Sequence, residues 1–407
     1  MNTTRSSLML AAAIAMTIPT AVPVPVAADS GPIKIAVITD MSGTYSAIAG
    51  QGAVEATKMA VEDFGGSVLG RPLEVDTIDH RNNGPEAAAK AAEAYDNGAE
   101  LALDLTNSAT AIAVDAVAKQ KHKLEIVTGG ASSALTGANC SRYTYHYAYD
   151  TYALAASTGR HIANESDGKT WYGIIPNYAF GQQMLTDFSA AIAPEGGSFV
   201  HSDMYPFPTT TDFSSYLLAA KQSGAQVLGV LNAGADTVNT MKQVKQFGLD
   251  KSMKIAVGLL FLSDVDALPD VFSGSRITTS WYWNEDKAAR AWADRFTKRV
   301  GGGLRPTDIQ AADYSATTQW LNAVKAVGTV DADKVQQYLD GRQFNDFYAH
   351  AAEWRARDHS VTHEMYVVEV LDKSVIKEPH AWFKILQVIP PSRAFRPEAQ
   401  STCNKDW

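Results

Sequence analysis

The stretch IKIAVITDMSGTYSAIAGQGAVEATKMAVEDFGG, residues 33–66, decides the fold class of this chain of 407 residues. Its first part, 33–40, is an apolar run typical of a buried strand, and 50–66 has helical spacing and ends on glycines. The same order of strand and helix is repeated along the next residues, at 72–99 and 100–121, and a fourth strand is expected at 123–130. Apolar strands that alternate with helices predict a parallel sheet covered by helices on both faces.

A second series of strand–helix units begins at TWYGIIPN, residues 170–177. A tyrosine-rich segment without a clear helix, 137–152, separates the two series. We therefore predict two α/β lobes joined by crossovers, with a cleft between them. A helix at 307–327 and strands at 364–371 and 383–389 complete one lobe or the other, and their pattern does not say which.

The charge of the chain limits its partners. A formal net charge of −9 argues against nucleic acid or an anionic membrane surface as the main partner. An acidic surface still allows a local anion site, because backbone dipoles can build one.

The N-terminus has the pattern of a secretory signal peptide, 1–28. Arg5 precedes an apolar stretch at 8–18, and Val26-Ala27-Ala28 is a small-residue cleavage pattern, so we expect cleavage near Ala28. A membrane anchor is the alternative, but the stretch is short for a span and several prolines follow it. No cysteine near the cut could accept a lipid, and we therefore expect a soluble, exported protein.

The chain has two cysteines, Cys140 and Cys403, both in the exported part. In an oxidising compartment two distant cysteines most simply form one disulfide, which would hold the C-terminal tail against the middle of the chain. A zinc site is the weaker interpretation, because neither cysteine lies in a CxxC or CxxH motif.

Small and polar residues follow several of the predicted strands, where open parallel sheets bind ligands. Four such stretches are TDMSGTYSAIAGQG at 39–52, LTNSAT at 105–110, TGGASS at 128–133 and NYAFGQQ at 177–183. Helices begin directly after two of them, and helix N-termini hold anions through unpaired N–H groups. We therefore expect the backbone here to approach a carboxylate or a similar group.

These stretches, in this order, carry a resemblance to a known family. The sequence resembles the periplasmic leucine/isoleucine/valine-binding protein family, the solute-binding subunits of hydrophobic amino-acid-type ABC importers. The resemblance covers about 31–403 and rests on the order and spacing of KIAVITDMSGTYSAIAGQG, DLTNSATAIAV, VTGGASSALTG, NYAFGQQM and DFSSYLLAAKQSGAQVLGVLNAG.

The resemblance implies the type I periplasmic binding fold: α/β, with two Rossmann-like lobes, parallel central sheets, three crossovers and closure on a ligand by hinge motion. By analogy, lobe 1 is 31–149 plus 282–343, and lobe 2 is 150–281 plus 344–394, with the tail 395–407 returning to lobe 1. The two cysteines fit the branch that this chain resembles. The implied partners are a small-molecule ligand and a membrane permease, in the periplasm, for a monomer without a cofactor.

The resemblance also implies the ligand-binding residues. Ser108, Gly130 and Ser132 match the positions that hold the ligand's carboxylate, and Tyr45 lies in the loop that lines the pocket. Phe180, with Tyr178 beside it, matches the aromatic residue that closes over the ligand from the second lobe. Each has a structural alternative, since serines often cap helices and aromatic rings can pack the hinge.

One departure from the family pattern concerns the charge of the ligand. Amino-acid binders place an acidic residue late in the second lobe, to pair with the ammonium group, whereas this chain has Leu260 and Phe261 near that position. A buried ammonium without a partner costs several kcal/mol. Asp236 or Asp313 could substitute for the missing acid.

The aromatic residues near the third crossover also bear on the class of ligand. Trp281, Tyr282 and Trp283 lie there, and we include Trp283 in the predicted site, although Trp281 and Trp283 could also be core residues. A carboxylate clamp that faces aromatic walls suits an aromatic acid better than a zwitterion. We therefore expect an aromatic carboxylate first, as in the family branch for benzoate- and cinnamate-like acids, and a branched-chain amino acid or amide second.

An enzyme and a sensory module are the rival classes. The sequence has no GxGxxG, GxxxxGK[ST], HExxH or GxSxG motif, and its histidines show no metal-ligand spacing, with His359 and His363 expected in an exposed turn. A sensory module with this fold would have to act through a separate membrane protein. We expect no catalytic residue and no metal site.

Overall fold

Strand β1 (Ile33–Thr39) lies in the middle of the first sheet of the computed structural model, which describes residues 1, 31–165, 168–405 and 407. The sheet has six strands in the order β2-β3-β1-β4-β5-β6, and all neighbours are parallel except β2 and β3. The signal peptide predicted at 1–28 lies outside the described residues apart from Met1. The further strands are β2 (Ser67–Val68), β3 (Arg71–Asp79), β4 (Ala99–Asp104), β5 (Leu124–Val127) and β6 (Thr144–His146).

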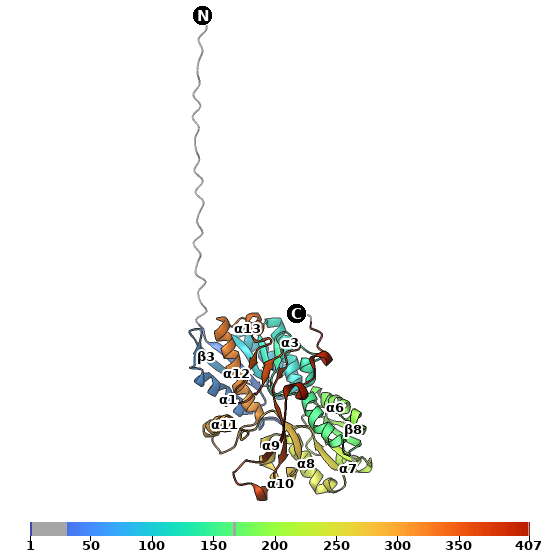
Figure 1. The fold of residues 1–407 in the computed structure, drawn as a ribbon. Helices are drawn as coiled ribbons and strands as arrows, with labels where there is room; N and C mark the ends of the chain where they lie inside the picture. Colours follow the sequence, from blue (N-terminus) through green and yellow to red (C-terminus); the bar gives the residue numbers. More distant parts are fainter. Residues whose placement is uncertain (2–30, 166–167, 406) are drawn as a thin grey trace. The chain divides into compact units, whose positions relative to one another are not determined.

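Helices α1 (Gly50–Asp63), α2 (Gly84–Asp96) and α3 (Ser108–Lys121) follow β1, β3 and β4, as predicted. Two asparagines start the later pair: the side chain of Asn83 accepts from Glu86 N, and that of Asn107 accepts from Ala109 N and Thr110 N. The long helix α12 (Asp308–Val327) packs against α1, and the two lie side by side in Figure 1.

The second sheet has four parallel strands in the order β10-β9-β7-β8. These elements match the second predicted series, and Figure 1 shows β8 beside the green-to-yellow helices α6, α7 and α8. The elements are β7 (Thr170–Pro176), α6 (Ala179–Ile192), β8 (Ser198–Tyr205), α7 (Ser214–Gln222), β9 (Val227–Val230), α8 (Ala235–Phe247) and β10 (Lys254–Val257). We call the part around the six-stranded sheet the first lobe and the part around this sheet the second lobe.

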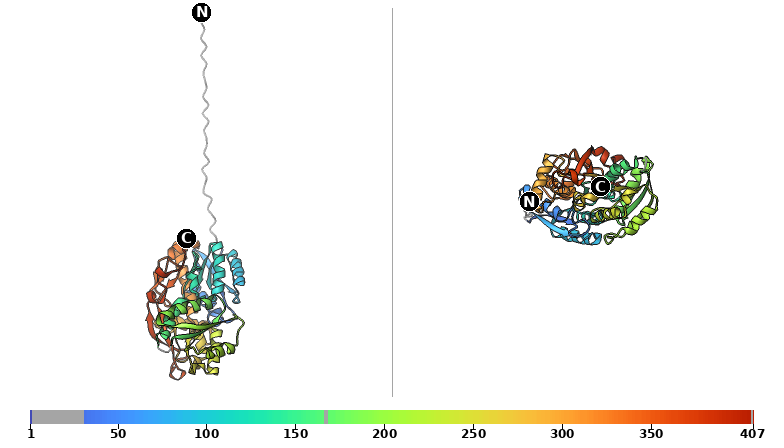
Figure 2. Two further views of the ribbon diagram at one scale, coloured as in Figure 1. Left: turned by 90° about the vertical axis from the view of Figure 1, so that its right-hand side faces the viewer. Right: turned by 90° about the horizontal axis from the view of Figure 1, so that it is seen from below.

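A third sheet differs from the predicted parallel sheets. Its strands β11 (Arg276–Thr279), β15 (Met365–Val370) and β16 (Phe383–Ile389) are antiparallel, in the order β11-β15-β16. Only 371–382 separate β15 from β16, and such a short connection, without a crossover helix, favours antiparallel pairing. In both views of Figure 2 the late segments, coloured orange to red, lie along one side of the unit Pro32–Trp407.

A fourth, small sheet bears on where one lobe ends and the other begins. It contains β12 (Gln343–Phe344), β13 (Ala352–Trp354) and β14 (Val361–Thr362), and it contacts β6: His146 bridges to Ser360, and the ring of Tyr145 lies 4.9 Å from that of Trp354. The lobe boundaries stay a proposal, and on these contacts we propose that 343–362 belong to the first lobe.

The remaining helices connect these sheets and cover them. They are α4 (Thr151–Leu154), α5 (Arg160–Ala163), α9 (Leu262–Ala267), α10 (Pro269–Phe272), α11 (Lys287–Val300), α13 (Ala332–Leu339) and α14 (Pro391–Ala394), with one π-helical turn at Ala155–Gly159 between α4 and α5. Within the described ranges, none of the helices has both the length and the apolar composition that a membrane crossing requires.

The C-terminal tail is joined to the segment between β5 and β6 by a disulfide between Cys140 and Cys403, the pairing that the sequence predicted. A second link joins the tail to the second lobe, because Arg396 donates to the carboxylate of Asp187 on α6 at 3.0 Å. The same buried carboxylate accepts from Ser133 at 2.6 Å and from Thr151 at 2.5 Å, so Asp187 joins the tail, the segment after β5 and the start of α4.

We expect the double variant Cys140→Ser, Cys403→Ser to lose about 2–4 kcal/mol of unfolding free energy, because the bridge restricts the unfolded chain. Denaturant unfolding with and without reductant measures this loss. Reductant should lower the stability of the wild type and leave the variant unchanged; equal sensitivity of both proteins would contradict the disulfide.

Candidate binding site

A small cavity lies where the loops after six strands converge. Its lining comes from both lobes, and every lining residue follows the carboxyl end of a strand, the place where open α/β sheets bind ligands. The lining residues are Tyr45 and Ile48 after β1, Thr106, Asn107 and Ser108 after β4, Gly129 and Ala131 after β5, Tyr178 and Phe180 after β7, Ala233 after β9, and Leu259 and Phe261 after β10.

The topology of each sheet explains why these loops meet. In the first sheet the chain moves from β1 to one side for β3 and to the other side for β4. In the second sheet it moves from β7 to one side for β8 and to the other for β9. Such a switch point leaves a crevice between the loops of the diverging units. The cavity lies at the switch points of both sheets.

Side chains fill most of the space between the two lobes in this structure. The cavity has a volume of about 10 Å³, which is about the room that one water needs. A solute of the size of a benzene ring enters only if the lobes separate or the aromatic side chains of the lining move aside.

Hydrogen-bond donors meet at the end of the cavity formed by the first lobe. Ser108 Oγ accepts from Ser132 N at 3.0 Å, which leaves the proton of the Ser108 hydroxyl for another acceptor. Within the described part of the chain, the backbone N–H groups of Gly130 and Ala131 have no acceptor, although both residues are buried. These three donors lie near the start of α3, whose dipole adds positive potential. Together they can hold a carboxylate without a basic side chain.

The structure gives a reason for the two glycines after β5 that differs from the one suggested by the sequence. A Cβ on Gly129 would lie 2.7 Å from Asp104 Oδ1, and one on Gly130 would lie 2.9 Å from the carbonyl oxygen of Leu105. The glycines therefore let the segment after β5 pack against the segment after β4.

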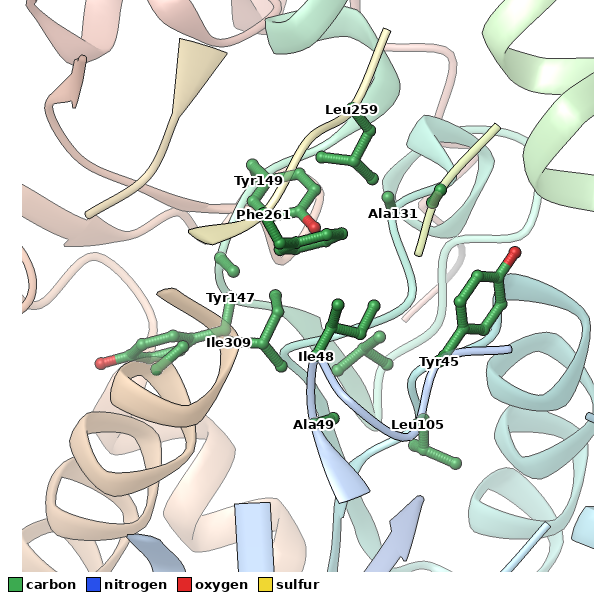
Figure 3. Close-up of a cluster of buried hydrophobic side chains, with 14 of the residues drawn as sticks. Tyr45, Ile48, Ala49, Leu105, Ala131, Tyr147, Tyr149, Leu259, Phe261 and Ile309 are labelled. Atoms are coloured by element: carbon green, nitrogen blue, oxygen red, sulfur yellow. The ribbon is translucent and has the colours of Figure 1, made fainter. Parts of the chain in front are cut away.

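The walls of the cavity are apolar. Figure 3 shows Ile48 and Tyr45 on one side of it, and Leu259 and Phe261 on the other, with Ala131 nearby. The ring of Phe261 also packs near Tyr149, with 6.4 Å between ring centroids. Walls of this kind suit the apolar body of a solute.

No acidic side chain lines the cavity within the described ranges. The carboxylate of Asp236, on the first turn of α8, accepts from Tyr205 Oη at 2.7 Å, and burial raises its pKa to about 6. Asp264 accepts from Phe261 N at 3.0 Å, and burial raises its pKa to about 7. Asp313, the other acid considered as an ammonium partner, is buried and accepts from Thr128 Oγ1 at 2.5 Å. Each of these acids already has a partner in the protein.

Three contacts join the lobes across the cavity. The hydroxyls of Tyr45 and Tyr178 lie 2.5 Å apart. Ala235 N, at the start of α8, donates to Thr44 O at 3.1 Å. The ring of Phe207 stacks on both Tyr45 and Tyr178, with centroid distances of 5.5 and 4.5 Å. The structure therefore represents a closed arrangement of the lobes.

The structure brings most of the predicted site residues together. Tyr45, Ser108, Tyr178, Phe180 and Phe261 line the cavity, and Gly130 lies between two lining residues. Ser132 and Asp236 lie just behind the lining, where the Ser132 hydroxyl caps the turn Ser133–Thr136 by accepting from Ala134 N at 3.3 Å.

Trp283 is not brought to this cavity. Its ring lies under the guanidinium groups of Arg305, at 4.1 Å, and Arg290, at 4.8 Å, and its Nε1 donates to His380 O. The neighbouring Trp281 donates to Phe347 O and packs edge-on against Trp292, so both rings have structural roles.

Sequence reasoning missed several residues of the site, namely Ile48, Thr106, Asn107, Ala131, Ala233 and Leu259 in the lining and Phe207 behind it. Each of them lies in the segment that follows a strand, and this position was the available signal.

Comparison with known proteins gives the family of this chain. A family model described as periplasmic binding protein matches residues 32–374. A crystal structure of a periplasmic binding protein from Burkholderia mallei is 44% identical, with a TM-score of 0.89, and the match covers 92% of this chain and 98% of that one. The search of curated proteins found no match.

Two further solved structures extend the comparison. A branched-chain amino acid ABC transporter periplasmic ligand-binding protein from Burkholderia xenovorans LB400 is 34% identical, with a TM-score of 0.79 and coverage of 91% of this chain and 99% of that one. A solute-binding protein of an ABC transporter from Rhodopseudomonas palustris BisB5, solved with 3,4-dihydroxybenzoic acid, is 19% identical and similar in fold, with a TM-score of 0.78 over 89% and 98% of the two chains.

We expect Gly234→Ala to favour separated lobes. Gly234 has a φ of +58°, and an added Cβ would lie 2.5 Å from Thr44 O across the closed contact. The matched control is Gly248→Ala, at a φ of +64° with no atom within 4 Å of the new Cβ. Both variants should lose about 1–3 kcal/mol of stability through backbone strain. Only Gly234→Ala should increase the radius of gyration in small-angle X-ray scattering; equal radii for the two variants would contradict the contact.

Proposed function

This chain belongs to the periplasmic binding protein family, and on that premise we propose that it is the solute-binding subunit of an ABC importer. It captures a small carboxylate, an aromatic acid by preference, between its two lobes in the periplasm and delivers it to a membrane permease. The role is one of binding and transport, without a catalytic step.

The absence of an acidic side chain from the described lining carries the choice of ligand. The ammonium group of an amino acid buried here would lack a counter-charge, at a cost of several kcal/mol. A carboxylate has the opposite need, because it requires hydrogen-bond donors. The hydroxyl of Ser108 and the N–H groups of Gly130 and Ala131 supply them without a partner that must first be displaced.

The apolar lining supports an aromatic body for the solute. Ile48 and Leu259 offer apolar contact surfaces, and the rings of Phe180, Phe261 and Tyr178 allow stacked or edge-on contacts. A solute that touches both lobes stabilises the closed arrangement, because it loses half of its contacts when the lobes separate. Capture and delivery then follow from one equilibrium between open and closed lobes.

A branched-chain amino acid is the second candidate. The Burkholderia xenovorans protein, which is 34% identical, is described as a branched-chain amino acid ABC transporter protein. Asp236 is the acid that could reach an ammonium group, if it exchanged its bond to Tyr205 for the ligand.

Thermal-shift screening distinguishes these ligands. We expect benzoate or cinnamate to raise the unfolding midpoint, and leucine, valine and benzamide to have little effect. A solute at a hundred times its Kd stabilises the folded state by about 2.7 kcal/mol. Stabilisation by leucine alone would contradict the aromatic acid, and loss of a bound solute by chemical conversion during incubation would contradict the transport role.

Ser108→Ala tests the carboxylate end of the site. We expect the affinity for benzoate in calorimetric titration to fall roughly ten- to hundredfold, since a hydrogen bond to a charged group contributes about 1.5–3 kcal/mol. The matched control is Ser132→Ala, whose hydroxyl caps a turn behind the lining. The control should lose about 1 kcal/mol of stability and keep its affinity. Unchanged affinity in Ser108→Ala would remove this residue from the site.

A further inference from the structure

Two buried carboxyl groups lie behind the donors that face the cavity. Asp104 is the last residue of β4, and Asp313 lies in α12; neither side chain is exposed to solvent. Thr106, which lines the cavity, donates to Asp104 Oδ1 at 2.5 Å. Thr128, which precedes the lining residue Gly129, donates to Asp313 Oδ1 at 2.5 Å. Each carboxyl therefore holds one of the two segments that form the donor end of the site.

The other oxygen of each carboxyl has no partner. Asp104 Oδ2 and Asp313 Oδ2 are buried without a hydrogen bond within the described part of the chain. Thr128 contacts both residues, because its N–H donates to Asp104 O at 3.1 Å and its hydroxyl donates to Asp313 Oδ1 at 2.5 Å. A buried ionised carboxylate with an unpaired oxygen is costly, and ionisation of one of two neighbouring acids disfavours ionisation of the other. Burial raises the pKa of Asp104 above its usual range, and burial together with the negative charge of Asp104 raises the pKa of Asp313 well above its usual range.

The backbone at Asp104 is also unusual. Asp104 and Leu105 have φ values of +78° and +56°, a region that residues other than glycine rarely occupy. This corner turns the chain from β4 toward Thr106 and Ser108. Strain of this kind persists where the surroundings fix it, and the bonds from Thr106 to Asp104 and from the Thr128 and Gly129 N–H groups to Asp104 O fix it here.

The neighbouring ionisable groups do not neutralise the two acids. Asp40, after β1, already accepts from Gly43 N, Tyr45 N and Asn82 Nδ2, and it adds negative charge. Burial lowers the pKa of His80, after β3, and of His146, on β6, to about 4, so both are neutral near pH 7. The hydroxyl of Tyr147, directly after β6, forms a hydrogen bond with the hydroxyl of Ser315. Among the described residues, no lysine or arginine forms a hydrogen bond or ion pair with either acid.

We propose that Asp104 and Asp313 together retain one proton beneath the solute's carboxylate, and that binding of an anionic solute is coupled to proton uptake by this pair. This rests on the proposed function. Both acids are positioning residues, because they act on the solute through the segments that carry Thr106, Ser108, Gly129 and Gly130.

The sign of the coupling follows from electrostatics. A bound carboxylate adds negative charge close to the pair, which makes ionisation of the pair less favourable and raises its pKa on binding. The affinity for an anionic solute therefore falls as pH rises through the range in which the free protein loses the shared proton. For one linked proton the fall is at most tenfold per pH unit.

Calorimetric titration with benzoate tests the proposal. We expect the affinity of the wild type to fall between about pH 6 and about pH 8.5, a range in which benzoate stays ionised. In two buffers of different ionisation enthalpy, the apparent binding enthalpies should differ by the amount that proton uptake requires. In the double variant Asp104→Asn, Asp313→Asn neither side chain can take up a proton, and the affinity should become independent of pH, with no proton uptake. A pH-independent affinity of the wild type would overturn the proposal.

The matched control is Asp150→Asn. Asp150 is buried, burial raises its pKa to about 7, and its side chain caps α4 by accepting from Ala153 N; it is not one of the lining residues. The control should keep the wild-type dependence of affinity on pH. Loss of this dependence in both variants would show a general effect of buried acids and would also overturn the proposal.

Stability without a solute separates this proposal from the proposed function. Folded-state pKa values above those of the unfolded chain mean that the folded protein holds a proton that the unfolded chain releases. The wild type should therefore lose stability relative to Asp313→Asn as pH rises from about 4 to above about 7. If the stabilities of the wild type and of Asp313→Asn changed with pH in the same way, this would contradict the shared proton. If benzoate binds at no pH, the proposed function fails, and the coupling of binding to proton uptake fails with it. A difference between the two proteins in the dependence of stability on pH would still show the shared proton.

Discussion

The backbone N–H groups of Gly130 and Ala131 are buried and have no acceptor within the described residues, and the site is built around them. A protein that leaves such donors unpaired loses free energy unless a ligand or water accepts from them. The Ser108 hydroxyl, at the start of α3, adds a third donor. Under the proposed function, these donors select a solute with a carboxylate, and the apolar walls opposite them select a solute with an apolar body.

The rest of the fold keeps this arrangement in place. Each sheet directs its loops toward the same crevice through a switch in strand order, and Asp104 and Asp313 hold the two donor segments through Thr106 and Thr128. The second lobe supplies Phe180, Leu259 and Phe261, and it reaches the first lobe through Thr44 and the pair Tyr45–Tyr178. Closure and recognition therefore use the same residues, as expected of a protein that must also release its solute.

Much of this could be predicted from the sequence, because parallel α/β units have a strong local pattern. Strand β16 has the bounds that its pattern predicted, and six predicted site residues lie at or within the lining, since a position after a strand fixes the place of a residue in such a fold. The disulfide was predictable because only two cysteines exist. Strand β6 was missed because its three residues lie in a tyrosine-rich segment without helical or alternating pattern. Trp283 was misplaced because an aromatic residue after a strand can equally stack under arginines, which only the tertiary structure decides.

The central claim is tested most directly by the amide NMR spectrum of the isotope-labelled protein, recorded with benzoate and with methyl benzoate. If the N–H groups of Gly130 and Ala131 donate hydrogen bonds to a carboxylate, benzoate should shift the amide proton resonances of both residues downfield. The neutral ester should leave them in place. Saturable binding of benzoate that leaves both resonances in place would contradict the account.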